Sequence, residues 1–319
     1  MIRLIRLELR RALARRLVRM LSVAVAAAII TAGISVFFAH EAASESDLRS
    51  RVGERDADIE ACERGEIYPP GEQVVIDQAG NHFEFEAPPL GTDQRTGMCQ
   101  FAFQIFSELD PRFRLDQVRD ALTGTITPLV LIALILAASL IGGEWRANTV
   151  AVQLTWEPRR LRVFAAKAAA AVLVGASFLF LAQVLLGGAL APSVAFRGTS
   201  AGLDAEWWRG TAGLIGRGTA MAALSGAIGF ALATAGRNTT AALGIMFGYI
   251  ALLEGALLGT IWPGIRSWLL LGNSIVFASG NDNIDIVGRS PTEAGILLGV
   301  YASAALLLSA AWFARRDVT

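Results

Sequence analysis

Few residues of this chain could carry acid–base, nucleophilic or metal chemistry, because the side chains concerned are scarce. The 319 residues include two histidines, His40 and His82, and one lysine, Lys167, which stands between two alanines. A loop that binds nucleotide phosphates needs a glycine-rich turn ending in lysine and then serine or threonine. This chain therefore has no such loop. We expect it to bind no cofactor and no metal of its own.

Intramembrane proteolysis is the enzyme class that a chain of this kind could still support. It needs a buried serine with a histidine, a metal-binding histidine pair, or two aspartates. His40 and His82 fall at or beyond the outer surface in the topology predicted below, and no aspartate falls within a predicted span. Ser225 and Gly226 are more typical of close helix packing. The sequence therefore predicts that the chain is not an enzyme.

Cys62 and Cys99, the only two cysteines, lie in a polar segment predicted to face the oxidising outside of the cell. We expect them to form a disulfide; the alternative is two free thiols. If chain entropy dominates, closing this loop stabilises the folded segment by about 4 kcal/mol.

Two charges, Arg217 and Glu254, fall well inside predicted spans, where a charge needs a partner or a wet cavity. Counted from the turn between their helices, they lie about 27 Å and 21 Å up adjacent spans, an offset that an arginine side chain can bridge. We expect an ion pair, either structural or lining a substrate path. The alternative is that Arg217 extends to the outer headgroups.

The segment from Gly143 to Lys167 has the charges for docking on a soluble protein. It reads GEWRANTVAVQLTWEPRRLRVFAAK. Glu144 closes one apolar run, a short helical stretch follows, and Pro158 breaks it. The basic residues after that proline hold the entrance of the next apolar run on the cytoplasmic side.

These residues must be positioned by membrane-spanning helices. Hydrophobic residues make up 54% of the chain, charged residues 18%, and the mean hydropathy is +0.49, with a formal net charge of zero. A soluble domain is less apolar and more charged. A bilayer core needs about 20 apolar helical residues. We predict six spans, at residues 20–39, 121–143, 164–190, 211–235, 239–261 and 294–314.

Basic residues in the short connections predict that both termini are cytoplasmic, because such residues resist translocation. Residues 1–19 carry seven arginines, and Ile2, Ile5, Leu9 and Leu13 share one helical face. We expect an amphipathic helix on the inner leaflet. The alternative is a plain basic anchor for the first span.

Two outer segments complete the predicted layout. Residues 40–120 hold 18 acids and 8 arginines, enough chain for a small α+β domain. Within it, residues 74–76 and the alternating residues 83–86 flank Gly80-Asn81 and predict a hairpin. Residues 262–293 include an apolar stretch of about 20 Å as a helix, too short to cross a bilayer. We expect this segment to re-enter the outer leaflet before the last span.

The chain resembles the permease subunits of type-2 ATP-binding-cassette (ABC) transporters. In that family a glutamate after the second span is followed by a threonine, a proline, one or two arginines, and a lysine that opens the third span. The segment 144–163 and the start of the next span match this order. The matching residues are Glu144, Thr149, Pro158, Arg159, Arg160 and Lys167. The family's usual glycine before the threonine is Asn148 here. The outer domain of about 80 residues departs from the compact members and leaves the substrate class open.

The resemblance implies an all-α polytopic permease in a bacterial plasma membrane, working as a homodimer or heterodimer. Two separate ATPase subunits would hold ATP and Mg²⁺ and move the segment between the second and third spans. The resemblance also implies export of a hydrophobic or amphipathic compound. The zero net charge gives no reason to expect nucleic acid as a partner. The alternative is a membrane-anchored sensor whose outer domain binds a ligand or peptide.

Overall fold

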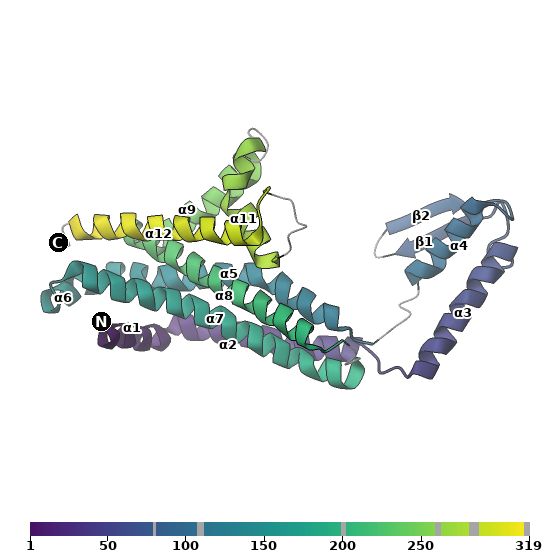
Figure 1. Cartoon of the computed structure of the whole chain (residues 1–319), viewed down its shortest axis with the longest axis horizontal. Helices are drawn as coiled ribbons and strands as arrows, with labels where there is room; N and C mark the ends of the chain where they lie inside the picture. Colours follow the sequence, from purple (N-terminus) through teal and green to yellow (C-terminus); the bar gives the residue numbers. More distant parts are fainter. Residues whose placement is uncertain (79–80, 107–111, 199–201, 259–262, 281–286, 316–319) are drawn as a thin grey trace. The chain divides into compact units, whose positions relative to one another are not determined.

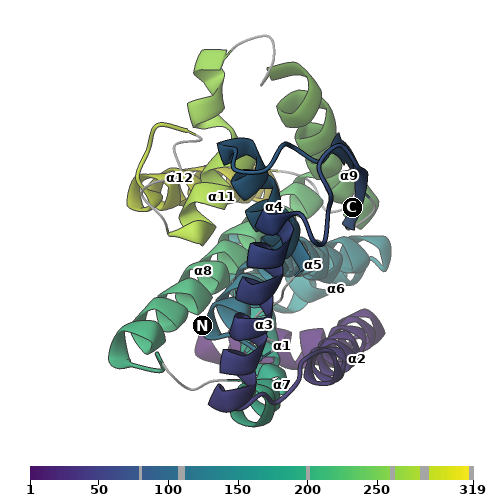
Figure 2. The same ribbon diagram turned by 90° about the vertical axis from the view of Figure 1, so that its right-hand side faces the viewer.

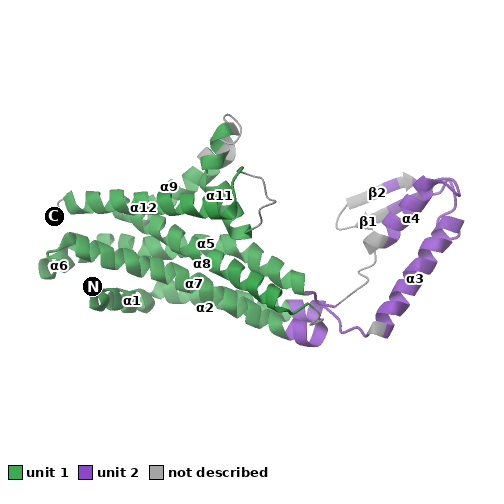
Figure 3. Cartoon of the chain, in the orientation of Figure 1, with its two compact units in different colours: residues 1–35, 115–191, 201–319 green, residues 36–114, 192–200 purple. Residues whose placement is uncertain are grey.

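The structure is a computed structural model that describes residues 1–78, 81–106, 112–198, 202–258, 263–280 and 287–315. The chain divides into two compact units (Figure 3). Unit 1 comprises residues 1–35, 115–191 and 201–319, and unit 2 comprises residues 36–114 and 192–200.

Five helices are long and apolar enough to cross a membrane, as expected for a multi-pass membrane protein. They are α2 (Arg16–Ala39), α5 (Leu115–Arg146), α7 (Arg160–Arg197), α8 (Ala205–Gly236) and α12 (Pro291–Arg315). All five extend beyond the predicted spans, because helical hydrogen bonding continues past the apolar run that hydropathy detects. The described part of the chain is thus mostly helical, in line with the predicted class.

Helix α8 lies in the middle of unit 1, packed against α5 and α12 (Figures 1 and 2). Small residues allow these helices to approach closely, as is usual in membranes. A Cβ added at Gly229 of α8 would lie 2.8 Å from the carbonyl oxygen of Leu134 in α5. A Cβ at Gly175 of α7 would lie 2.9 Å from the carbonyl oxygen of Ala222 in α8. Glycine at these two positions sets the distance between the helices.

The amino-terminal helix α1 (Ile2–Ala14) is shorter than the amphipathic segment predicted over residues 1–19. Arg15 is extended, with φ −69° and ψ 136°, and α2 begins at Arg16. The buried residues of α1 are Glu8 and Ala12, whereas Ile2 and Leu13 of the predicted apolar stripe are exposed. The face of α1 that meets the protein is therefore partly polar.

The predicted fifth span corresponds to α9 (Thr239–Gly248), continued by a π-helical stretch, η1 (Tyr249–Leu258). The predicted outer segment contains a 3₁₀ turn, η2 (Pro263–Trp268), and the ten-residue helix α11 (Leu270–Ser279). Residues 281–286 of that segment lie outside the described residues.

Residues 45–106 of unit 2 contain two helices joined by a hairpin. Helix α3 (Glu45–Arg64) begins with a capping box in which Ser44 and Asp47 bond each other's backbone amides. Strands β1 (Gln73–Gln78) and β2 (Asn81–Glu86) pair antiparallel, with Val74 opposite Phe85, which confirms the predicted hairpin. Gly80 of the predicted turn lies outside the described residues. Helix α4 (Asp93–Phe106) follows.

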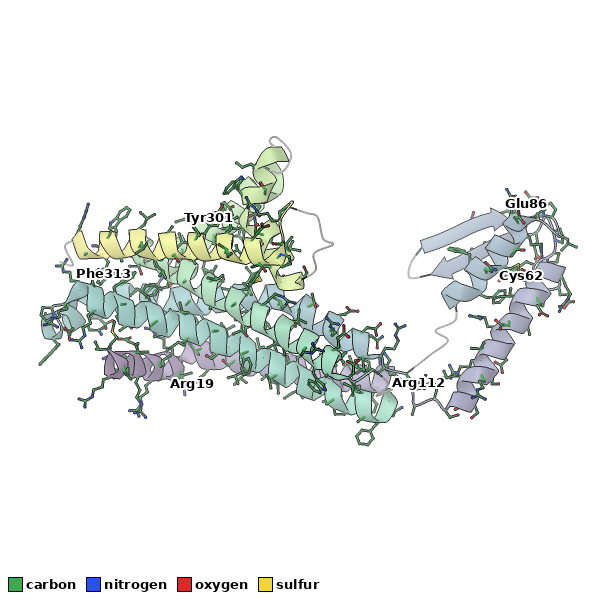
Figure 4. The ribbon with its side chains drawn as sticks, in the orientation of Figure 1. Arg19, Cys62, Glu86, Arg112, Tyr301 and Phe313 are labelled. Atoms are coloured by element: carbon green, nitrogen blue, oxygen red, sulfur yellow. A yellow bond between two sulfur atoms is a disulfide. The ribbon has the colours of Figure 1, made fainter. Side chains whose placement is uncertain are left out.

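A disulfide between Cys62 of α3 and Cys99 of α4 confirms the predicted pairing (Figure 4). The two Cα atoms are 5.8 Å apart, and both cysteines are fully buried. Arg95 of α4, only 1% exposed, lies beside them and donates to the backbone carbonyls of Cys62, Tyr68 and Pro88. This arginine was not among the residues predicted from the sequence. Its hydrogen bonds join α4 to α3 and to the segments that precede and follow the hairpin.

Candidate functional site

The segment between α5 and α7 folds as a short helix bounded by two breaks. Helix α6 (Thr149–Trp156) follows Asn148, which has φ +54° and ψ +16°. That left-handed conformation favours glycine, but asparagine also tolerates it. At the other end, Glu157 is extended, as the residue before Pro158 should be. Thr149 donates its hydroxyl to the carbonyl oxygen of Glu144 at 3.2 Å.

Lys167 and Glu144 lie together in a buried charge cluster that also includes residues not predicted from the sequence. The Lys167 ammonium lies 2.5 Å from Glu144 Oε2 and 3.1 Å from Glu8 Oε1. Arg15 donates to Glu144 Oε1 at 3.1 Å and to the Ser139 carbonyl at 2.8 Å. We call Glu8, Arg15, Glu144 and Lys167 the charge cluster.

The charge cluster holds two acids and two bases, and Arg11, half-exposed on α1, also lies 3.4 Å from Glu8 Oε1. The side chains of Lys167, Glu8 and Glu144 are 5%, 6% and 13% exposed, so water screens them poorly. Each charge therefore depends on its partners for the solvation that it has lost. The cluster connects α1 to the end of α5 and the first turns of α7.

Helix α6 is joined to the charge cluster by Gln153, whose amide nitrogen donates to Glu8 Oε1 at 2.9 Å. A displacement of α6 would therefore act on α1 through Gln153 and on α5 through the bond from Thr149. These contacts make the helix a mechanical connection between the surface of unit 1 and its spanning helices.

The outer face of α6 is apolar and exposed. Trp156 is 87% exposed and Val152 is 60% exposed. Both line a groove of about 860 Å³ between α6 and α1, to which Leu4, Leu7 and Arg16 also contribute. An exposed tryptophan beside basic residues is typical of a surface that binds another protein.

The remaining residues of the predicted coupling segment lie after α6. Pro158 and Arg159 are exposed, and Arg160, half-buried, lies 3.5 Å from the carbonyl oxygen of Ala314 near the end of α12. The structure thus brings Glu144 and Lys167 together, places Thr149 beside them, and puts the proline and arginines at the surface. Glu8 was missed, although it is the only acid among the first 19 residues.

Trp145 connects the same end of unit 1 to the last helix and to the turn between α8 and α9. Its ring lies 6.0 Å from that of Phe313 in α12, and Arg237 stacks on it at 4.8 Å. Helix α1, helix α6 and the end of α12 therefore lie at one end of unit 1 (Figure 1).

The structure does not bring Arg217 and Glu254 together; each contacts one end of α11 instead. Glu254 Oε1 accepts the amides of Leu271 and Gly272 in the first turn, and Arg217 donates to the carbonyl of Ser279 in the last. Leu271 and Ser279 are eight helical positions, or about 12 Å, apart, which is too far for an ion pair. A negative charge at the amino end of a helix and a positive charge at its carboxyl end both interact favourably with the helix dipole.

A glycine lets Arg217 reach α11. Gly280 has φ +62°, and a Cβ there would lie 2.1 Å from the Arg217 Cζ atom. The two charges that were predicted to pair within the membrane therefore each contact one end of α11.

Neither family models nor curated proteins give a match to this sequence. The function is therefore inferred from the residues and contacts described above.

Proposed function

We propose that the chain is the membrane-spanning permease subunit of an ATP-driven ABC transporter, with α6 as the docking helix for a separate ATPase. The observation that carries this proposal is the exposed apolar face of α6, combined with its bonds to the buried charge cluster. An ATPase that drives transport needs a surface on the permease to which it can bind. It also needs a rigid connection from that surface to the spanning helices.

The proposed topology counts α9 with η1 as the fifth of six spans. The end that bears α1 and α6 then faces the cytoplasm of a bacterial cell, and two copies of the permease form the working dimer. Supporting this orientation, the exposed arginines of α1 lie at that end. Two ATPase subunits would hold ATP and Mg²⁺, and the cargo would be a hydrophobic or amphipathic compound moved outward.

Coupling would act through the contacts of α6. When the ATPase pulls on Val152 and Trp156, Thr149 transmits the displacement to the end of α5, and Gln153 transmits it to Glu8 on α1. Lys167 joins both paths to α7. The charge cluster would keep these helix ends together as one body while the bundle changes its opening.

The test is purification of the tagged chain from its native membrane in mild detergent, with the bound ATPase identified by mass spectrometry and by its phosphate-binding loop. The variants are Val152→Glu and Trp156→Glu. Trp208→Glu, at the start of α8 and 60% exposed in the parent, is the matched control. We avoid Glu144, because its buried charge would confound docking with folding.

We expect the α6 variants to lose about tenfold or more of the bound ATPase, because exposed aromatic residues dominate the energy of such interfaces. Their unfolding temperature should match the parent. An ATPase retained by both α6 variants, or lost equally from the Trp208 variant, would refute α6 as the docking helix. A co-purifying kinase or regulator without an ATPase would favour the sensor alternative.

A further inference from the structure

An apolar groove between α2 and α7 lies apart from the docking face of α6. It has a volume of about 200 Å³. Val18, Ser22 and Ile29 of α2 form one wall, and Ser177, Leu181 and Leu185 of α7 form the other. Of the 24 residues of α2, the buried ones are Val18, Ile29 and Gly33. Most of the other residues of this helix are exposed.

The groove is closed at one end by direct helix contact. A Cβ added at Gly33 of α2 would lie 2.7 Å from the carbonyl oxygen of Ala189 in α7, so the two backbones meet there. Val18 and Ile29, which line the groove, are eleven positions apart, or about 17 Å along the helix. Half of a bilayer's hydrocarbon core is about 15 Å thick. The groove therefore has the length of one lipid acyl chain within one leaflet.

Positive charge lies at the open end, next to the junction of α1 and α2. Leu13 and Val18 line the groove on either side of this junction. Arg19, the residue after Val18 of the groove wall, is exposed and donates to the carbonyl oxygen of Ala14 at 3.1 Å. A guanidinium has five N–H donors, so this bond leaves others for a phosphate.

We propose that the groove binds an anionic phospholipid of the leaflet that contains α1, with one acyl chain between α2 and α7 and the headgroup phosphate on Arg19. The combination of an apolar slot of leaflet length with an arginine at the headgroup level fits a lipid of this charge. A zwitterionic lipid would gain less from Arg19, because its own ammonium offsets the phosphate. The proposal does not depend on the transport function.

The test is native mass spectrometry of the purified protein with added phosphatidylglycerol or phosphatidylcholine, both with palmitoyl and oleoyl chains. Ala26→Phe fills the groove, whose wall includes Ala26. Ala24→Phe is its control, because Ala24 is exposed and lies on the opposite side of α2. Arg19→Gln removes the headgroup contact, and Arg6→Gln removes an exposed charge of α1.

We expect the parent to retain phosphatidylglycerol in preference to phosphatidylcholine. Arg19→Gln should weaken that retention about fivefold, and Ala26→Phe should abolish it, whereas both controls keep it. Because Arg19 is at the surface, its variant tests the proposal even if Ala26→Phe folds poorly.

Equal retention of the two lipids, or equal loss in the Ala24 control, would show ordinary annular lipid and overturn the proposal. Light scattering measures the oligomeric state of the same variants. If Ala26→Phe converts a dimer to a monomer while phosphatidylglycerol stays bound, the groove holds a second copy of the chain and the proposal fails.

Discussion

Replacing Lys167 by methionine tests whether the charge cluster holds α1 and α7 to the end of α5. The substitution leaves Glu8 and Glu144 buried without the ammonium that lies 3.1 Å and 2.5 Å from them. Breaking a buried pair costs about 3–5 kcal/mol. Glu144 still accepts from Arg15 at 3.1 Å, so we expect a loss near the lower limit, about 3 kcal/mol.

A matched double variant separates charge imbalance from lost packing. Lys167→Met combined with Glu8→Gln leaves Glu144 balanced by Arg15, so it should recover part of the stability, with a coupling of about 1–3 kcal/mol. Arg10→Met, an exposed position on α1, should change stability by less than about 0.5 kcal/mol.

The assay is thermal unfolding in detergent, where about 3 kcal/mol corresponds to a fall of about 6–12 °C. A loss below about 1 kcal/mol for Lys167→Met would show that solvent or other groups compensate the two acids. Strict additivity in the double variant would equally refute the cluster as a coupled unit, because independent sites add.

Three further outcomes follow from local geometry. Gly142→Ala should destabilise the protein by about 1–3 kcal/mol in thermal unfolding, since its Cβ would lie 2.5 Å from a backbone nitrogen of α9. Gly124→Ala, with open space around it, should raise stability by about 0.5–1 kcal/mol; a loss of similar size at both glycines would contradict the packing. Without reductant, Cys62 and Cys99 should not react with maleimide in denaturant, and changing both to serine should make unit 2 sensitive to protease; labelled thiols would disprove the bond. Hydrogen bonds from the N-cap serine, chiefly its hydroxyl, lower the pKa of Asp47 below its usual 3.8. The stabilisation of the start of α3 is therefore present above about pH 4 and lost as the pH falls through the lowered value. Amide exchange at the start of α3 should show this dependence, and Asp47→Asn should abolish it.

Features set by local pattern were predictable from the sequence. Five charge-free apolar runs predict α2, α5, α7, α8 and α12, because the part of a helix that contacts lipid must be apolar. The hairpin of unit 2 follows from alternation around a turn. The disulfide followed because the chain has only two cysteines and places both in one segment.

The charged contacts depended on the tertiary structure. Glu8 lies 159 positions from Lys167, and no local pattern relates the two; their contact requires the rotation of α1 about its axis and the position of α7 beside it. The ion pair between Arg217 and Glu254 was predicted only from the positions of the two residues along their helices. That prediction did not consider α11, whose two ends lie closer to these side chains. Hydropathy and spacing thus determined which segments form helices and which can enter a bilayer. Which charges meet was decided by helix rotation and packing, because a buried charge must find its partner among whatever groups the assembled helices bring within about 4 Å.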